Sequence, residues 1–140
     1  MTMVVDFADG FSSSTAPVLE GLGNETFLID NNKSTFTNFT GLEFGANSSV
    51  FASFEVERKT DSVTYRQTGS VIFRKNTSAG TWDMEFGGFV GDDLVQTSIS
   101  LAQHIILQIT NAGQVQYKSG NMSGTGYSGK FKLNLSRINS

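Results

Sequence analysis

The sequence predicts an all-β fold, an antiparallel β-sandwich of jelly-roll-like type, and two observations support this prediction. The 140 residues include 15 glycines, 12 phenylalanines and one proline, and 16% of them are charged. This composition is typical of strands with aromatic side chains that are joined by many turns. Alternating apolar and polar residues recur between turn signals at roughly ten-residue spacing, as in sandwiches and barrels. We expect one domain with a single core.

The first 24 residues differ from the rest of the chain. They form a polar run punctuated by glycine, with isolated apolar residues and no sustained period. We therefore expect an extended N-terminal arm at residues 1–24 and the sandwich at residues 25–140. The arm is either a frayed terminus or a tether that docks its apolar side chains onto a neighbouring subunit or a capsid; these contact candidates are Val4, Val5, Phe7 and Phe11.

The middle of the chain contains the clearest strand patterns. Residues 50–57 alternate between apolar and mostly polar side chains, which predicts a strand with one buried face. A turn is expected at residues 59–62. The apolar residues of 62–75 keep one parity across Gly69, which predicts a long strand that is bent or bulged at that glycine.

The second half of the chain continues the strand pattern. Residues 82–86 alternate before the Gly87-Gly88 pair, where we expect the strand to end. Residues 94–101 follow a glycine-aspartate turn, and a weak helical period leaves a short helix within 94–106 as an alternative. Asn111-Ala112-Gly113 predicts a three-residue hairpin loop with glycine at a positive φ. Residues 127–136 alternate again and predict the last strand.

Charge and cysteine content exclude several functional classes. Ten Lys plus Arg against 13 Asp plus Glu give a net charge of -3, so no positive excess is available for a nucleic acid or an anionic membrane. The absence of cysteine excludes disulfide scaffolds, zinc-finger clusters and thiol catalysis. No apolar run reaches the length of a membrane span, and the start lacks a signal-peptide pattern. We expect no membrane association and no secretion by a signal peptide.

The sequence gives little support for a catalytic site or a cofactor site. The single histidine, His104, has no acidic residue within ten positions, so a catalytic role would need distant partners. Asp92 and Asp93 lack the ligand spacing of a calcium loop and are expected to form a solvated turn. The glycine-rich residues 120–129 precede a strand instead of the helix that a phosphate loop requires. We expect no enzyme activity, no metal and no cofactor.

Several strands carry large apolar residues on both faces. Since a sandwich strand normally buries one face, the second set of apolar side chains needs a cover. The N-terminal arm and other copies of the chain are the candidates, and a contiguous apolar patch too large for a soluble monomer favours copies. We predict that the chain forms a homo-oligomer, and symmetry alone favours a dimer. The predicted subunit contacts of this second apolar face are Ile72, Phe89 and Ile106.

Seven segments between about Ile29 and Ile138 resemble the small β-modules of tailed-bacteriophage virion proteins. The most distinctive piece is the hairpin Gly113-Gln114-Val115-Gln116-Tyr117 followed by the strand at residues 127–132. The first 24 residues lie outside the resemblance, and residues 94–103 look like an insertion. The segments are residues 30–32, 40–44, 51–57, 82, 90–93, 109–119 and 127–132.

The resemblance implies a non-enzymatic, usually trimeric protein on the outside of the particle. A homotrimeric capsid decoration (cement) protein is the first expectation, because a fibre normally carries a coiled-coil shaft and no heptads are present. The alternative is a short tail-fibre, tip or receptor-binding module, in which Tyr117 or Tyr127 would stack on host surface glycans. The implied partners are copies of the chain and other virion proteins, such as major capsid or tail proteins. The implied location is the virion, assembled in the host cytoplasm.

Overall fold

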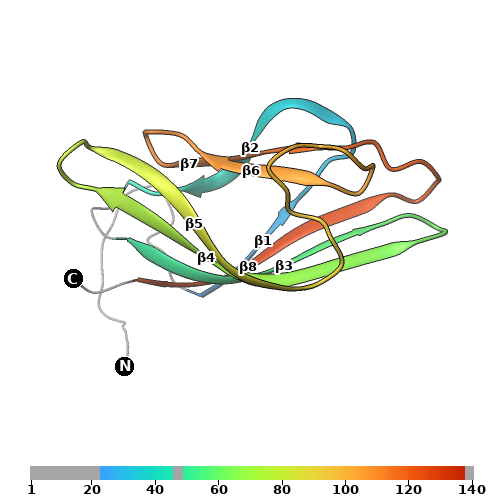
Figure 1. The fold of residues 1–140 in the computed structure, drawn as a ribbon, viewed down its shortest axis with the longest axis horizontal. Coiled ribbons are helices and arrows are strands. Elements are labelled where there is room, and N and C mark those ends of the chain that lie inside the picture. The colour runs from blue at the N-terminus through green and yellow to red at the C-terminus, as the bar shows by residue number, and fades with distance from the viewer. Residues whose placement is uncertain (1–22, 46–48, 138–140) are drawn as a thin grey trace.

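The computed structural model describes residues 23–45 and 49–137, which form eight strands in two antiparallel sheets (Figure 1). A five-stranded sheet has the order β1-β8-β3-β4-β5, and a three-stranded sheet has the order β2-β7-β6. The strands are β1 (Gly23–Leu28), β2 (Lys33–Glu43), β3 (Val50–Lys59), β4 (Thr64–Asn76), β5 (Thr81–Gly91), β6 (Ile105–Ile109), β7 (Gln114–Ser119) and β8 (Ser128–Arg137).

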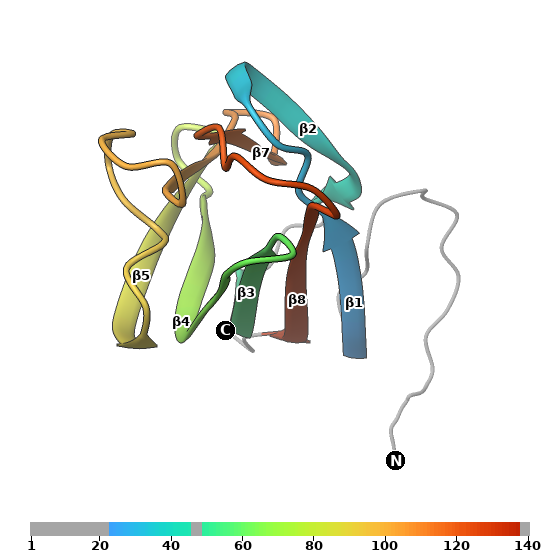
Figure 2. The same ribbon diagram turned by 90° about the vertical axis from the view of Figure 1, so that its right-hand side faces the viewer.

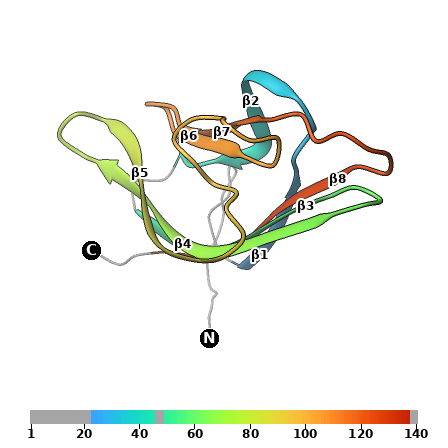
Figure 3. The same ribbon diagram turned by 45° about the vertical axis from the view of Figure 1, so that its right-hand side comes forward.

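The sheets stack face to face, with the three-stranded sheet above the curved five-stranded sheet (Figures 2 and 3). The predicted antiparallel sandwich is therefore confirmed. The eight strands divide unequally, with five in one sheet and three in the other. Here β4 and β5 form a hairpin that stays within the larger sheet, and a turn closed by the Gly80 N–H on the Asn76 carbonyl holds the two strands together.

The core lies between the sheets and is rich in aromatic rings. On β3, Val50, Ala52, Phe54 and Val56 point inward, as their alternation predicts. The Phe39 ring of β2 lies 4.5 Å from the ring of Tyr117 and 5.1 Å from that of Phe131, so it joins the two sheets. Burial of these large apolar groups is the main stabilising contribution, at roughly 1.5–3 kcal/mol for each side chain.

The predicted irregularity near Gly69 exists but lies in the neighbouring strand. Between the pairs Gly69–Phe89 and Val71–Phe86, β5 carries one residue more than β4, whereas the β3–β4 register is unbroken. The extra residue falls at Gly87-Gly88, so this pair makes a bulge and does not end the strand. Glycine fits there because a Cβ atom on Gly87 would overlap the Ser70 hydroxyl.

The segment after β5 differs from both predictions made for it, a strand at residues 94–101 and a short helix within residues 94–106. Residues 92–104 form neither a strand nor a helix; they make a loop with a single bridge between Val95 and Ile105. The next hairpin is as predicted: Gly113 has a φ of 103°, and the Thr110 N–H donates to the Gln114 carbonyl at 2.9 Å.

The boundary between arm and sandwich also shifts, because β1 already begins at Gly23, inside the predicted arm. The arm contacts predicted at Val4, Val5, Phe7 and Phe11 lie outside the described residues. No helix in the described part of the chain is long and apolar enough to cross a membrane.

Four connections gather at one end of the sandwich, and we call this end the loop end. They join β1 to β2, β3 to β4, β5 to β6 and β7 to β8 (Figure 1). Gly23 pairs with Leu135, so the first and last described strand ends lie together at the opposite end. The sandwich therefore presents its four loops on the side away from its described chain ends.

Candidate functional site

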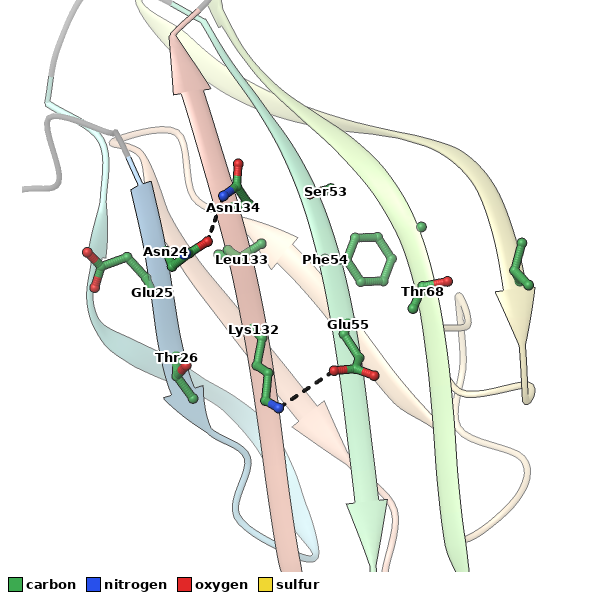
Figure 4. A pocket seen from close by; sticks show the side chains of 12 residues that line it. Asn24, Glu25, Thr26, Ser53, Phe54, Glu55, Thr68, Lys132, Leu133 and Asn134 are labelled. Carbon is green, nitrogen blue, oxygen red and sulfur yellow. Dashed lines mark hydrogen bonds and ion pairs between the residues drawn. The ribbon is translucent and has the colours of Figure 1, made fainter. Parts of the chain in front are cut away.

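A shallow trough of about 580 Å³ lies on the outer face of the five-stranded sheet, which faces away from the three-stranded sheet (Figure 4). Two rows of cross-strand neighbours form it. One row joins Asn24, Asn134 and Ser53, and the other runs from Thr26 through Lys132, Glu55 and Thr68 to Val90. We call this feature the outer-face trough; its lining residues are Asn24, Glu25, Thr26, Ser53, Phe54, Glu55, Thr68, Gly69, Val90, Lys132, Leu133 and Asn134.

Polar groups of the trough are only partly paired. The Asn134 side-chain amide donates to the Asn24 side-chain oxygen at 2.6 Å, and Lys132 lies 3.6 Å from the Glu55 carboxylate. The hydroxyl groups of Thr26, Ser53 and Thr68 have no hydrogen-bond partner among the described residues. The trough thus offers both donors and acceptors beside a compensated ion pair.

Strand alternation places these groups. On β3 the inward residues are apolar, so Ser53 and Glu55 between them must point outward; on β8 the same holds for Lys132 and Asn134. Within residues 23–45 and 49–137, no group of three or more metal-ligating side chains is found.

The loop end is organised by Arg58, whose side chain is 0% exposed. Its Nε donates to Tyr127 Oη at 3.1 Å, its Nη1 to the carbonyls of Ala102 and His104 at 3.0 and 3.3 Å, and its Nη2 to Asn31 Oδ1 and the Gly120 carbonyl at 2.9 and 2.8 Å. All five N–H groups of the guanidinium are used. Arg58 therefore ties the β1–β2, β5–β6 and β7–β8 connections to the end of β3.

The fourth connection joins this network through a carboxylate. Asp61, in the β3–β4 turn, accepts hydrogen bonds from the Thr125 hydroxyl at 2.7 Å and from the Thr125 N–H at 3.3 Å. These bonds lower the pKa of Asp61 below its ordinary value. Asn31 adds a contact between loops, since its side-chain oxygen accepts the Met122 N–H at 2.9 Å.

The two tyrosines predicted to stack on sugars, Tyr117 and Tyr127, make contacts within the fold. Tyr117 is buried in the core, and its hydroxyl accepts the Asp30 N–H at 2.9 Å. The half-buried Tyr127 donates to the Ile29 carbonyl at 2.7 Å while its ring lies against Arg58. Burial raises the pKa of both hydroxyls. The Tyr117 ring is therefore not available to stack on a sugar, and that part of the expectation is corrected; the Tyr127 ring is partly exposed, so its stacking role stays a prediction.

His104 has an acidic neighbour that lies just outside the ten-position window. The His104 side chain is 4% exposed, with Nε2 3.2 Å from Asp93 Oδ2 and Nδ1 3.2 Å from the Ser100 hydroxyl. These are the residue types of a catalytic triad. However, Nδ1 also accepts the N–H groups of Ser100 and Leu101 at 3.3 and 3.1 Å. The Nδ1 lone pair already accepts these hydrogen bonds. The geometry therefore fits a histidine that holds the loop in place better than it fits a general base.

The predicted subunit contacts do not form one patch. Ile72 lies on the outer face of the five-stranded sheet, opposite Phe51. Ile106 lies on the outer face of the three-stranded sheet, opposite Lys118. The Phe89 ring is 42% exposed at the β5 edge but lies 6.0 Å from the core ring of Phe54. The three predicted contacts therefore lie on separate surfaces of the fold, and their role in subunit contact stays a prediction.

Arg58 and the trough were missed by the sequence reasoning. A signal for Arg58 was present, because it continues the inward parity of Val50, Ala52, Phe54 and Val56. A charged residue at an apolar position implies buried hydrogen-bond partners. The trough gave no comparable signal, since its polar residues come from four strands that pair only in the folded chain.

No family model and no curated protein matches the chain. Among solved structures, the crystal structure of the Acinetobacter phage vB_ApiP_P1 tailspike protein is similar, with a TM-score of 0.48 and 12% identity over 99% of this chain and 26% of the tailspike. The chain thus corresponds to about a quarter of that protein's length, and a similarity at this level carries no argument about function.

Proposed function

We propose that this chain is a non-enzymatic binding module on the exterior of a tailed-phage virion, of receptor-binding type, and that the loop end is its contact surface. The observation that carries the proposal is the Arg58 network. A fully buried guanidinium whose five donors reach three connections holds the loops in place before any partner arrives. Preordered loops lose less conformational entropy on binding.

The location on a virion rests on the resemblance of residues 29–138 to phage β-modules. The position of the loops, opposite the described strand ends, suits a module that projects its loops outward. The absence of enzyme activity is part of the proposal, and it is supported by the occupied Nδ1 of His104. Self-association as a homotrimer is the expected state, and light scattering would show three times the mass of one chain.

Binding to susceptible bacterial cells tests the loop end. Ser123 is exposed in the β7–β8 loop, so Ser123→Arg should block contact without disturbing the core. Thr40→Arg, on the exposed face of β2, is the matched control. We expect about tenfold weaker cell binding for Ser123→Arg, equivalent to ~1.4 kcal/mol, and no change for the control. Equal binding by both variants would contradict the proposal.

Capsid decoration is the alternative location. Immunogold labelling of particles with an antibody against this chain separates the two: label at the tail supports the receptor-binding module, and label spread over the capsid supports the decoration protein. Loss of decoration in the Ser123→Arg variant would assign the loop end to capsid contact.

A further inference from the structure

We infer that the outer-face trough is a second binding site, and that it takes a neutral, multiply hydroxylated ligand of the size of one or two saccharide units. The trough lies on a sheet face, away from the loops through which we propose that the module binds. The inference therefore goes beyond the proposed function and holds wherever the chain is located. It rests on the shape, the hydrogen-bonding groups and the charge of the trough.

The shape suits a small ligand. The volume of about 580 Å³ falls in the range of small-molecule sites, roughly 300–1,000 Å³. Small residues make the floor, with Ser53 on β3 and Thr68 and Gly69 on β4. Val90, which is 74% exposed on β5, stands at one side and offers an apolar contact for the C–H face of a ring.

The free hydrogen-bonding groups match a polyol. After the Asn134–Asn24 bond is made, the Asn24 amide N–H groups and the Asn134 side-chain oxygen keep unused capacity. The hydroxyls of Ser53 and Thr68 each offer a donor and acceptors. Asn24, Asn134 and Ser53 are successive cross-strand neighbours, on strands about 4.8 Å apart. A ligand with several hydroxyl groups in one plane can use them together, whereas an apolar ligand would leave them unpaired.

Charge decides between neutral and ionic ligands. Lys132 and Glu55 lie 3.6 Å apart and offset each other's charge, so the pair adds no net charge to the trough. Glu25 is the remaining charged residue of the lining, and its carboxylate points away from the trough in Figure 4. No uncompensated cation faces the trough, so a phosphate, a sulfate or an acidic sugar lacks the partner that it needs.

Chemical-shift mapping of the full chain tests the site. The probes are maltose, lactose and diacetylchitobiose as neutral ligands, with sialyllactose as the anionic comparison. Each is titrated to roughly 20 mM, well above the weak affinity of ~1 mM that a shallow site gives. We expect saturable shifts at Ser53, Thr68, Lys132 and Asn134 with at least one neutral saccharide, and no stronger binding of the anionic comparison.

Two variants and a control sharpen the test. Ser53→Arg places a long side chain across the floor and should abolish the shifts; Thr40→Arg, on the other sheet, should leave them unchanged. Asn134→Ala removes one side chain and should weaken binding about two- to tenfold. Circular dichroism verifies that each variant is folded.

Three results would overturn the inference: no shift with any neutral saccharide, shifts located outside the trough, or binding of the anionic sugar alone. The cell-binding assay keeps this outcome separate from the proposed function. If Ser53→Arg loses saccharide binding while cell binding depends only on Ser123, the two surfaces act independently.

Discussion

Different kinds of interaction stabilise the two ends of the sandwich. At the loop end, one buried cation fixes the connections through directional hydrogen bonds. At the opposite end, the aromatic end, the Phe44 ring lies 4.8 Å from Phe73 and 5.4 Å from Trp82, next to the Gly113 turn. Apolar packing tolerates a change of shape if volume is kept, whereas a buried polar network fails when one donor is removed. Substitutions of similar size should therefore have unequal effects at the two ends.

The largest expected effect comes from Arg58→Met, which keeps an unbranched side chain about as long as the stem of arginine and removes its five donors. The half-buried Ala102 carbonyl would lose the guanidinium as its partner, and the buried His104 and Gly120 carbonyls would each keep one backbone N–H donor, from Gly120 and Asn32. We expect a loss of at least about 3 kcal/mol in the free energy of unfolding, measured by urea denaturation. Hydrogen exchange should accelerate first in the loops. A loss below about 1 kcal/mol would refute the role given to Arg58.

Gly113→Ala tests backbone strain at the aromatic end. Gly113 has a φ of 103°, and a Cβ atom there would overlap the Phe44 carbonyl oxygen. We expect a loss of about 2 kcal/mol. Gly80→Ala is the control, since Gly80 has a φ of 72° with nothing within 4 Å of the added atom. The control should lose only about 1 kcal/mol, and equal losses would show that the contact with Phe44 has no effect.

Phe44→Leu gives the direct contrast to Arg58→Met. The side chain stays apolar and close in volume, so its neighbours Phe73 and Trp82 can repack around it. We expect a loss of about 1–1.5 kcal/mol in the same urea experiment. A loss as large as that of Arg58→Met would mean that the two ends do not differ in the way described.

Tyr127→Phe removes the hydroxyl that donates to Ile29 and accepts from Arg58, and we expect a loss of about 1 kcal/mol at neutral pH. The pH dependence adds a second readout. Because burial raises the pKa of Tyr127 and Tyr117 above their ordinary value of 10.0, the folded state holds these protons more tightly. Their contribution to stability is complete below pH 10 and is lost as the pH rises through the raised values. The decline between about pH 10 and 12 should be shallower in the variant.

The smallest effect is expected for Asp61→Asn. This substitution changes the exposed hydrogen bonds that join the β3–β4 turn to the β7–β8 loop. The hydrogen bonds from Thr125 lower the pKa of Asp61 from its ordinary value of 3.8. The stabilisation is present above that value and is lost as the pH falls through the lowered pKa. We expect faster hydrogen exchange of the Thr125 amide at neutral pH in the variant, with no difference in acid. An unchanged rate at neutral pH would show that these hydrogen bonds do not order the loop.

Local patterns in the sequence predicted most of the strands. The alternation at residues 50–57 and 127–136 and the Asn111-Ala112-Gly113 loop depend on neighbours a few residues apart, and the structure confirms them. The bulge was assigned to Gly69 instead of Gly87-Gly88, because a bulge is a property of two paired strands and one strand's pattern does not show which of them carries the extra residue.

The candidate sites were beyond the reach of the same patterns. The Arg58 partners lie between 27 and 69 positions away in sequence, and the trough joins residues from Asn24 to Asn134. The second apolar face shows the same limit: Ile72 and Ile106 were grouped because their strands carry apolar residues on both faces, while the fold puts them on different sheets.

The sequence by itself determined the all-β class, the single core and the side of β3, β4 and β8 that faces it, because burial of alternating apolar residues depends on local periodicity. The tertiary structure decided how the strands divide into five and three, where the buried cation of Arg58 finds its carbonyl partners, and which polar residues meet on one outer face. The reason is that strand pairing brings distant residues together, and hydrogen bonds act only over about 3 Å.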